Sequence, residues 1–356
     1  MPNILLVVYF VFFIACLVFS ILINSLLVKF IKTLGIRNTE ETIIKWGAQS
    51  KPAIGGISFY IIFLLSIITY YFFFERSEYF PNPQFIGILF ASTLGFLMGM
   101  FDDAYNTKPF IKLFAQISCG IILISTNVYI HIFEYEILNY AITILWVVGI
   151  MNSLNLLDNM DAIAAIVSIS IILTIIINLF WIDDFKNPDI FILVGLFAAL
   201  VGFLKFNWSP SIIYMGDTGS QFLGAFLAAL GIIYFWNHSE GQGIEIFSKQ
   251  IITSVLIFSI PIIDTTTVVI KRIRKGRSPF VGGKDHTAHH LSYLGFNERQ
   301  VALIFSGISC VTMILSIVAI NFISNWGLLH IILYGTYLLG LFITLFYIAN
   351  LNAKRN

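Results

Sequence analysis

The sequence predicts an all-α, polytopic integral membrane protein with about eleven transmembrane helices. Of its 356 residues, 58% are apolar and 11% are charged, whereas a soluble domain has about 45–50% and about 25%. The apolar residues fall into eleven runs, each long enough to cross a bilayer as a helix. A third observation, the uneven placement of lysine and arginine, predicts the orientation. So little chain separates the runs that we expect one transmembrane domain over residues 1–356.

The expected spans follow in this order: 4–28, 54–74, 85–101, 111–130, 137–151, 162–181, 189–204, 219–236, 250–270, 300–320 and 326–350. The first run lacks a positively charged start and a small-residue cleavage site, so we interpret it as a retained span and not as a signal peptide. Cys16, Cys119 and Cys310 lie inside apolar runs and predict neither a disulfide nor a metal site.

Alternate connections between the runs differ strongly in charge. Of the 20 Lys and Arg residues, all lie on one side except Arg76, Lys186 and Lys249. Because positive residues concentrate on the cytoplasmic side, we expect the amino terminus outside, the carboxyl terminus inside and an odd number of spans. The net charge of +1 indicates no partner, and no nucleic acid is expected.

Six aspartates lie at or within the inward ends of the runs: Asp102, Asp103, Asp158, Asp161, Asp217 and Asp264. A carboxylate at such a place is costly unless it is paired or metal-bound, so these residues are functional candidates. A transporter needs a site that is reachable from both sides, usually near the midplane. The one-sided acids therefore favour a catalyst that joins a water-soluble phosphorylated substrate to a lipid, and a transporter or lipid flippase is the competing class.

Asp102 and Asp103 end the third run as neighbouring carboxylates. Two adjacent anions repel each other, so a cation or a retained proton must stabilise the pair. Mg²⁺ is bound in proteins through one or two carboxylates together with substrate phosphates. The alternative is a plain helix end whose acids pair with Lys108 or Lys112.

Residues 152–161 carry two amides and two carboxylates at helical spacing. Asn152 and Asn155 are three apart, as are Asp158 and Asp161, so each pair shares a helix face. Such groups can bind ribose hydroxyls, a base edge or metal-bound water. The alternative is a polar turn in which Asp161 caps the sixth span.

The segment 207–220 ends in the sequence MGDTGS, directly before the eighth run. Gly216 and Gly219 let the backbone approach a ligand closely, and the free N–H groups of a helix start attract phosphate. Asp217 is then a candidate metal ligand beside that anion site. The alternative is an ordinary N-cap, because aspartate caps helices well.

The ninth run and the loop after it carry the last group of motifs. Pro261 permits a kink, and we expect Asp264 either to orient a lysine or metal ligand or to pair with one neighbour. Residues 271–275 suit positive-inside anchoring, whereas Arg277 and the histidines beyond it are candidate diphosphate contacts. A zinc site is the competing interpretation of Asp285, His286, His289 and His290.

Lys51 opens the second span together with Gly55 and Gly56. The lysine supplies a charge that suits phosphate, and the glycines allow tight backbone packing or ligand approach.

In their order along the chain, these motifs resemble those of the polyprenyl-phosphate N-acetylhexosamine-1-phosphate transferases, glycosyltransferase family 4. The resemblance covers residues 51–290 and comprises KPxxGG, the paired aspartates, NxxNxxDxxD, NxxPxxxxMGDTGS, PxxDT, GRSPF and a terminal HH. It implies an enzyme of the bacterial cytoplasmic membrane that depends on Mg²⁺, with Mn²⁺ as the other candidate ion, and has its catalytic loops on the cytoplasmic face.

The implied reaction transfers a HexNAc 1-phosphate from a UDP-sugar to undecaprenyl phosphate and releases UMP. The product would prime cell-envelope polysaccharide such as lipopolysaccharide or O-antigen. The resemblance leaves open whether the protein forms a homodimer.

Two departures from the family pattern stand out. The family commonly has DGxDG, whereas here Asn159 and Ala162 replace the glycines, and alanine adopts a left-handed backbone poorly. The branch that uses UDP-MurNAc-pentapeptide has three consecutive histidines, but Thr287 and Ala288 interrupt them in this chain. Together with GRSPF, the interruption favours a UDP-GlcNAc donor over the muramoyl alternative.

Carried over residue by residue, the resemblance implies a role for each motif residue. Asp217 would bind the metal, with Asp102 and Asn155 as further ligands, and Asp102 and Asp103 would act on the lipid phosphate as catalytic residues. The nucleotide would be held, or its loop ordered, by Asn152, Asn155, Asp158 and Asp161. The diphosphate would be neutralised by Lys51, Arg277, His289 and His290. Such phosphoryl transfer relies on positioning and charge stabilisation.

Overall fold

The computed structural model describes residues 2–34, 51–73, 82–239, 246–276, 278, 283 and 285–351. The described residues fold into helices: α1 (Pro2–Leu34), α2 (Gly55–Phe73), α3 (Pro83–Tyr105), α4 (Pro109–Ser125), α5 (Glu136–Leu157), α6 (Ile163–Trp181), α7 (Pro188–Asn207), α8 (Gly216–Gly231) with the π-helical turn η1 (Ile232–Trp236), α9 (Phe247–Ile257), α10 (Ser259–Arg274), α11 (Thr287–Tyr293), α12 (Glu298–Phe322) and α13 (Leu328–Leu351). Within these ranges the β-type pairing is one isolated bridge between Ala53 and Tyr214. The all-helical architecture predicted from the sequence is confirmed.

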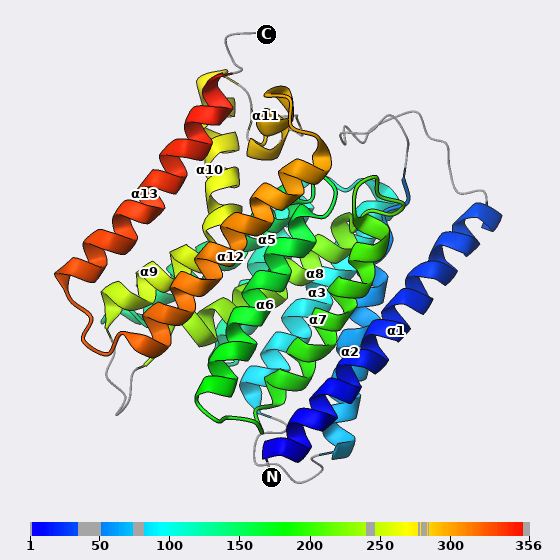
Figure 1. Ribbon diagram of the computed structural model, residues 1–356, viewed down its shortest axis with the longest axis horizontal. Coiled ribbons are helices and arrows are strands. Elements are labelled where there is room, and N and C mark those ends of the chain that lie inside the picture. Colours follow the sequence, from blue (N-terminus) through cyan, green and yellow to red (C-terminus); the bar gives the residue numbers. More distant parts are fainter. Residues whose placement is uncertain are drawn as a thin grey trace.

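Nine helices in the described part of the chain are long and apolar enough to cross a membrane. The two other expected spans correspond to α4, a shorter apolar helix, and to the pair α9 and α10, which is bent by 75°. The first residues of α1 and the last turn of α13 lie at opposite ends of the bundle (Figure 1). Eleven spans and the outward amino terminus stay predictions.

The bend between α9 and α10 lies where the sequence places a proline. α9 ends at Ile257 and α10 begins at Ser259, two residues before Pro261. Proline has no N–H to donate to the carbonyl four residues earlier, which is that of Ile257, so the helix cannot continue straight through this point. The predicted kink is confirmed.

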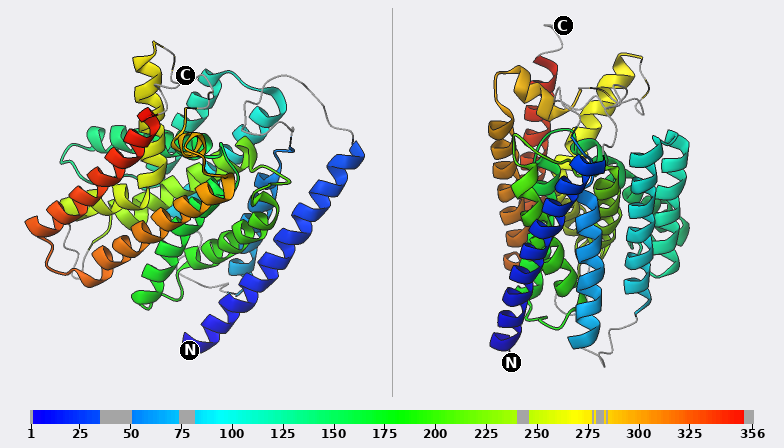
Figure 2. Two further views of the ribbon diagram at one scale, coloured as in Figure 1. Left: turned by 45° about the horizontal axis from the view of Figure 1, so that its top comes forward. Right: turned by 90° about the vertical axis from the view of Figure 1, so that its right-hand side faces the viewer.

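Helix α8 is the central helix of the bundle. Every residue from Gly216 to Gly231 is buried except Asp217, and the helix packs against α2, α3 and α5. In contrast, α1 and α13 stand at opposite edges and expose apolar side chains (Figure 2). A helix that is apolar all round belongs in such a core, so the partly exposed Asp217 is the exception that marks a site.

Glycines bring the backbones of α2 and α3 against α8. A Cβ atom on Gly56 would lie 2.2 Å from the Gly219 nitrogen, and a Cβ atom on Gly99 would lie 2.1 Å from the Asp217 carbonyl oxygen. Of the two predicted roles for the glycines that open the second span, the structure therefore shows tight packing. Gly219 likewise serves this helix contact, whereas Gly216 adopts the left-handed backbone, with φ +76°.

Candidate active site

The amino-terminal end of α8 is capped by a side chain from another helix. Asp103 at the end of α3 accepts hydrogen bonds from the Asp217 nitrogen at 3.0 Å, the Thr218 nitrogen at 2.8 Å and the Thr218 hydroxyl at 2.6 Å. These are N–H groups that a helix start leaves without a partner. Asp103 occupies two of the backbone donors at this helix start, and a phosphate site there stays a prediction.

Asp217 does not cap its own helix, so the capping alternative is wrong. Its Oδ2 atom lies 2.6 Å from Lys112 Nζ, and its Oδ1 atom accepts a hydrogen bond from Asn155 Nδ2 at 2.8 Å. Asn155 also donates to Ser220 at 2.9 Å. The side chain is thus oriented by α4 and α5, and 22% of it is exposed.

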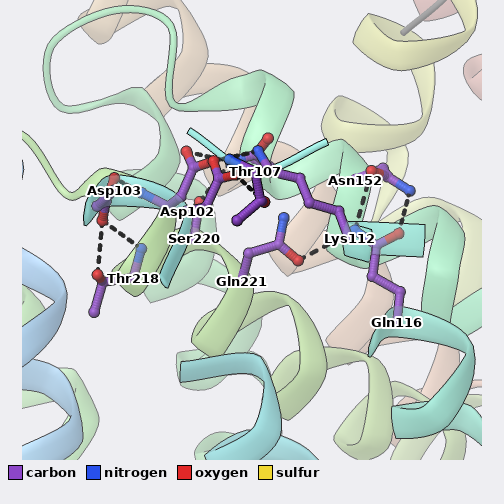
Figure 3. Close-up of polar contacts among 11 residues, drawn as sticks. Asp102, Asp103, Thr107, Lys112, Gln116, Asn152, Thr218, Ser220 and Gln221 are labelled. Atoms are coloured by element: carbon purple, nitrogen blue, oxygen red, sulfur yellow. Dashed lines mark hydrogen bonds and ion pairs between the residues drawn. The ribbon is translucent and has the colours of Figure 1, made fainter. Parts of the chain in front are cut away.

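Lys112 joins two carboxylates from different helices. Its Nζ atom lies 2.5 Å from Asp102 Oδ2 as well as 2.6 Å from Asp217 Oδ2. The other oxygen of Asp102 accepts hydrogen bonds from the backbone nitrogen and the hydroxyl of Thr107. We call Asp102, Asp103, Lys112, Asn155 and Asp217 the carboxylate site (Figure 3). The lysine pairing foreseen as the alternative for the paired aspartates therefore exists, but it extends to Asp217 and assembles the site.

The carboxylate site offers oxygen ligands of the kind that a hard cation binds. Asp102 and Asp217 both approach one ammonium group, so the space between them already holds a positive charge. Carboxylate and amide oxygens are what Mg²⁺ prefers, and two carboxylates suffice when substrate phosphates complete the shell. No three His, Cys, Asp or Glu side chains converge on one metal position in the described ranges. The zinc site considered for Asp285 and the histidines, all of them described, is therefore wrong.

A second group of contacts orders the loop before α8. Asp161 accepts hydrogen bonds from the Ser211 nitrogen at 2.8 Å and hydroxyl at 2.7 Å. Lys51 donates to the same hydroxyl at 2.9 Å and lies 3.7 Å from Asp161 Oδ2. Asp161 therefore orders this loop and does not cap α6, whose N-cap is Ala162. Asp158, the C-cap of α5, is buried.

Ala162 adopts the left-handed backbone at one of the two replaced glycines, with φ +69°. Its N–H donates to Asn207 Oδ1 at 2.9 Å, and Asn207 in turn donates to the Ile213 carbonyl at 2.9 Å. Asn159, at the other replaced glycine, is not left-handed. The loop therefore keeps a left-handed residue at position 162 even though alanine tolerates it poorly.

The histidines lie on and just before the short helix α11. Asp264, 1% exposed, accepts from the Thr287 nitrogen at 2.7 Å and lies 2.8 Å from His286 Nδ1, so it anchors the start of α11. His290 contacts Lys271 Nζ, which also donates to the carbonyl of Ala349. Burial, followed by the charge of Lys271, lowers the pKa of His290 to about 4. His290 is therefore neutral near pH 7.

The remaining predicted residues have different positions. His289 is buried on α11, and Arg277 lies outside the described residues. Asn152 does not reach the carboxylate site but pairs with Gln116, donating to its Oε1 atom at 2.8 Å and accepting from its Nε2 atom at 3.1 Å.

Sequence reasoning missed Gln116 and Gln221 and did not assign Lys112 to the site. The available signal was polar spacing inside apolar runs: Lys112 and Gln116 are four apart, as are Asp217 and Gln221. Residues four apart share a helix face. Polar pairs at this spacing on otherwise apolar helices would have indicated a polar interior below the site.

Comparison with known proteins points to the same family as the sequence motifs. The family described as glycosyl transferase family 4 matches residues 85–235, a range that contains the whole carboxylate site. The probable undecaprenyl-phosphate N-acetylglucosaminyl 1-phosphate transferase of Bacillus subtilis (strain 168) is 27% identical over 276 residues, 75% of this chain and 73% of the relative. The phospho-N-acetylmuramoyl-pentapeptide-transferase of Staphylococcus saprophyticus is 28% identical over 340 residues, 86% of this chain and 97% of the relative. The decaprenyl-phosphate N-acetylglucosaminephosphotransferase of Mycobacterium tuberculosis is 27% identical over 240 residues, 61% of this chain and 59% of the relative.

The fold and the site define a polytopic membrane protein with a carboxylate and lysine site at one end of its helical bundle. Over residues 85–235 the chain matches glycosyl transferase family 4, the family that the motifs resemble.

Proposed function

We propose that the protein transfers an N-acetylhexosamine 1-phosphate, GlcNAc-1-phosphate above all, from a UDP-sugar to undecaprenyl phosphate and releases UMP. The observation that carries this proposal is the carboxylate site, in which Asp102 and Asp217 from two helices converge on Lys112. It lies wholly inside the residues that match the family. The named relatives are phosphotransferases that use a polyprenyl phosphate or a muramoyl-pentapeptide phosphate.

In the proposed reaction, an oxygen of the lipid phosphate attacks the phosphorus that carries the sugar, and the bond to the UMP phosphate breaks. Mg²⁺, or Mn²⁺ in its place, would supply neutralisation of the phosphate charge when bound. Asp217 and Asp102 would hold the ion, and Asn155, whose Nδ2 donates to Asp217, would become a further ligand only after its amide turns its oxygen to the ion. Lys112 places a positive charge where phosphate oxygens must gather, which suits a reaction that depends on charge stabilisation.

The structure supports different roles for the two neighbouring aspartates. Both oxygens of Asp103 accept hydrogen bonds from the first turn of α8, so its proposed role is to position Asp217. Asp102 faces Lys112 and is the acid proposed to position the lipid phosphate and to take up a proton from it. Lys51, Asp158 and Asp161 would shape the loop that holds the nucleotide.

The muramoyl donor is the second candidate, favoured by an alignment that covers 97% of the staphylococcal relative. The interrupted histidines favour the GlcNAc-type donor, because two residues separate His286 from His289. The proposed location is the bacterial cytoplasmic membrane, where the lipid product would prime cell-envelope polysaccharide.

A donor panel tests the proposal. Membranes that contain the protein are given undecaprenyl phosphate with UDP-GlcNAc, UDP-GalNAc or UDP-MurNAc-pentapeptide, and UMP and the diphosphate-linked lipid are measured with and without Mg²⁺. We expect Mg²⁺-dependent UMP release with a simple UDP-HexNAc. Efficient turnover of the muramoyl donor alone would overturn the donor assignment, and the absence of UMP release from every donor would overturn the enzyme proposal.

A further inference from the structure

Below the carboxylate site lies a second polar layer made only of amides. Gln116 on α4, Asn152 on α5 and Gln221 on α8 form it, and we call these three residues the amide cluster. Gln116 Nε2 donates to Asn152 Oδ1 and to Gln221 Oε1, both at 3.1 Å, and Gln116 Oε1 accepts from Asn152 Nδ2 at 2.8 Å. Gln116 and Gln221 are fully buried.

The amide cluster is built from three helices that also contribute to the carboxylate site, and its residues lie one turn further into the bundle. Gln116 follows Lys112 by four residues on α4, Gln221 follows Asp217 by four on α8, and Asn152 precedes Asn155 by three on α5. Residues at these spacings lie on the same helix face. The two layers therefore join the same three helices at successive turns, and Figure 3 shows them together.

Helix α4 depends on these polar contacts for its position against α8. Its side-chain hydrogen bonds to α8 in the described structure are those of Lys112 with Asp217 and of Gln116 with Gln221. Both N–H groups of the Gln116 amide donate within the amide cluster, and its oxygen accepts one hydrogen bond there. Losing the Gln116 amide would leave Asn152 Oδ1 and Gln221 Oε1 without the donor that they share, and proteins avoid unpaired polar groups in their interior.

We propose that Gln116 is a positioning residue, which through the amide cluster fixes α4 against α5 and α8 so that Lys112 lies between Asp102 and Asp217. The expected loss of activity rests on the proposed function, whereas the expected position of Lys112 does not. Gln221 makes one hydrogen bond in the cluster, through its Oε1 atom. Its Nε2 atom is a buried donor with no partner among the described residues, so Gln221 alone does not hold the cluster together. The residue that satisfies both neighbours is Gln116.

The test removes the amide at two positions and at a matched control. Gln116→Met and Gln221→Met each replace an amide with an apolar side chain of similar length. Gln221→Met removes only one hydrogen bond of the cluster, so we expect it to fold even if Gln116→Met does not. Gln250→Met makes the same change at another buried glutamine, which is 1% exposed but lies on α9 and donates to the His238 carbonyl. Each variant is compared with the parent protein in detergent.

The first measurement is the rate at which an amine-acylating reagent modifies Lys112, followed by mass spectrometry, with the exposed Lys108 as the internal reference. Only a lysine freed from its carboxylates loses its proton easily and reacts. We expect the Lys112 rate, relative to Lys108, to rise several-fold in Gln116→Met and Gln221→Met and not in Gln250→Met. An unchanged rate, or an equal rise in the control, would overturn the inference.

The second measurement is UMP release, divided into kcat and KM. We expect kcat in Gln116→Met to fall by between about tenfold and about a hundredfold, as for a misplaced catalytic group, with little change in KM for the UDP-sugar. Faster acylation of Lys112 with an unchanged kcat would also overturn the positioning role. If the parent protein releases no UMP from any donor, the proposed function fails, while the acylation rates still decide whether the amide cluster positions Lys112.

Discussion

Asp217→Asn is the substitution that most sharply separates function from stability in this protein. An amide at this position can give its oxygen either to Lys112 or to Asn155, whereas the carboxylate gives one oxygen to each, at 2.6 Å and 2.8 Å. In either orientation the new amide nitrogen faces another donor. The variant therefore loses one of its two contacts and its negative charge, while the shape of the side chain is kept.

The expected effect on stability is small because two contributions oppose each other. One charge-assisted hydrogen bond is lost, which would cost about 1.5–3 kcal/mol. The repulsion that Asp217 exerts on Asp102 and Asp103 is relieved, and the remaining Asp102 still pairs with Lys112 at 2.5 Å. The helix start is unaffected, because Asp103 caps it through backbone N–H groups. We expect the melting midpoint to change by a few degrees at most.

The expected effect on activity is large. If Asp217 holds the catalytic cation, losing its charge should lower UMP release by about a hundredfold or more, which corresponds to roughly 3 kcal/mol of transition-state stabilisation. Asp183→Asn is the matched control, because Asp183 is exposed in the loop between α6 and α7 and has φ +57°, which asparagine also tolerates. The assay measures UMP release and the melting midpoint of both variants. Activity of Asp217→Asn within about threefold of the parent protein would refute the metal role, since that is under about 1 kcal/mol.

Three further predictions concern stability. Ala162→Gly and Ala165→Gly each delete one buried methyl group, but only residue 162 is left-handed. Thermal unfolding should therefore show Ala162→Gly to be the more stable variant by about 1–2 kcal/mol. Gly56→Ala would place a Cβ atom 2.2 Å from the backbone of α8 and should lower the melting midpoint by the equivalent of about 1–3 kcal/mol. Gly149 has open space around it, so Gly149→Ala should be neutral or stabilising. Burial lowers the pKa of His290 to about 4, below the unfolded value of about 6.5, so its contribution to stability is complete above pH 6.5 and is lost as the pH falls towards 4. Stability measured over that range should vary less with pH in His290→Gln than in the parent protein, and equal slopes would contradict the shifted pKa.

The sequence was sufficient for the features that depend on local composition. Apolar runs predicted the positions of the helices, because a helix that crosses lipid must satisfy its backbone internally and must be apolar over its length. Pro261 predicted the bend between α9 and α10, because its effect on the backbone is confined to one turn. Asp102, Asn155 and Asp217 were expected at one end of the bundle from charge asymmetry alone, and the structure brings them together.

What the sequence could not predict are contacts between residues far apart in the chain. Asp103 caps a helix that begins more than a hundred residues later, and no local pattern distinguishes such a cap from a free carboxylate. The same is true of Lys112, whose second partner is 105 residues away. The left-handed Ala162 was expected to be unfavourable from its own preference, and the structure shows the opposing contribution, a hydrogen bond that the Ala162 N–H donates to Asn207 Oδ1.

The charges of the carboxylate site constrain the order in which it can be filled. Three carboxylates and one ammonium group give a formal charge of −2, and both proposed substrates carry phosphates, so they would be repelled by the empty site. A divalent cation brings the site to neutrality, whereas Lys112 alone does not. Lys112 contacts both Asp102 and Asp217, so the proposed cation and this ammonium group would share the two carboxylates.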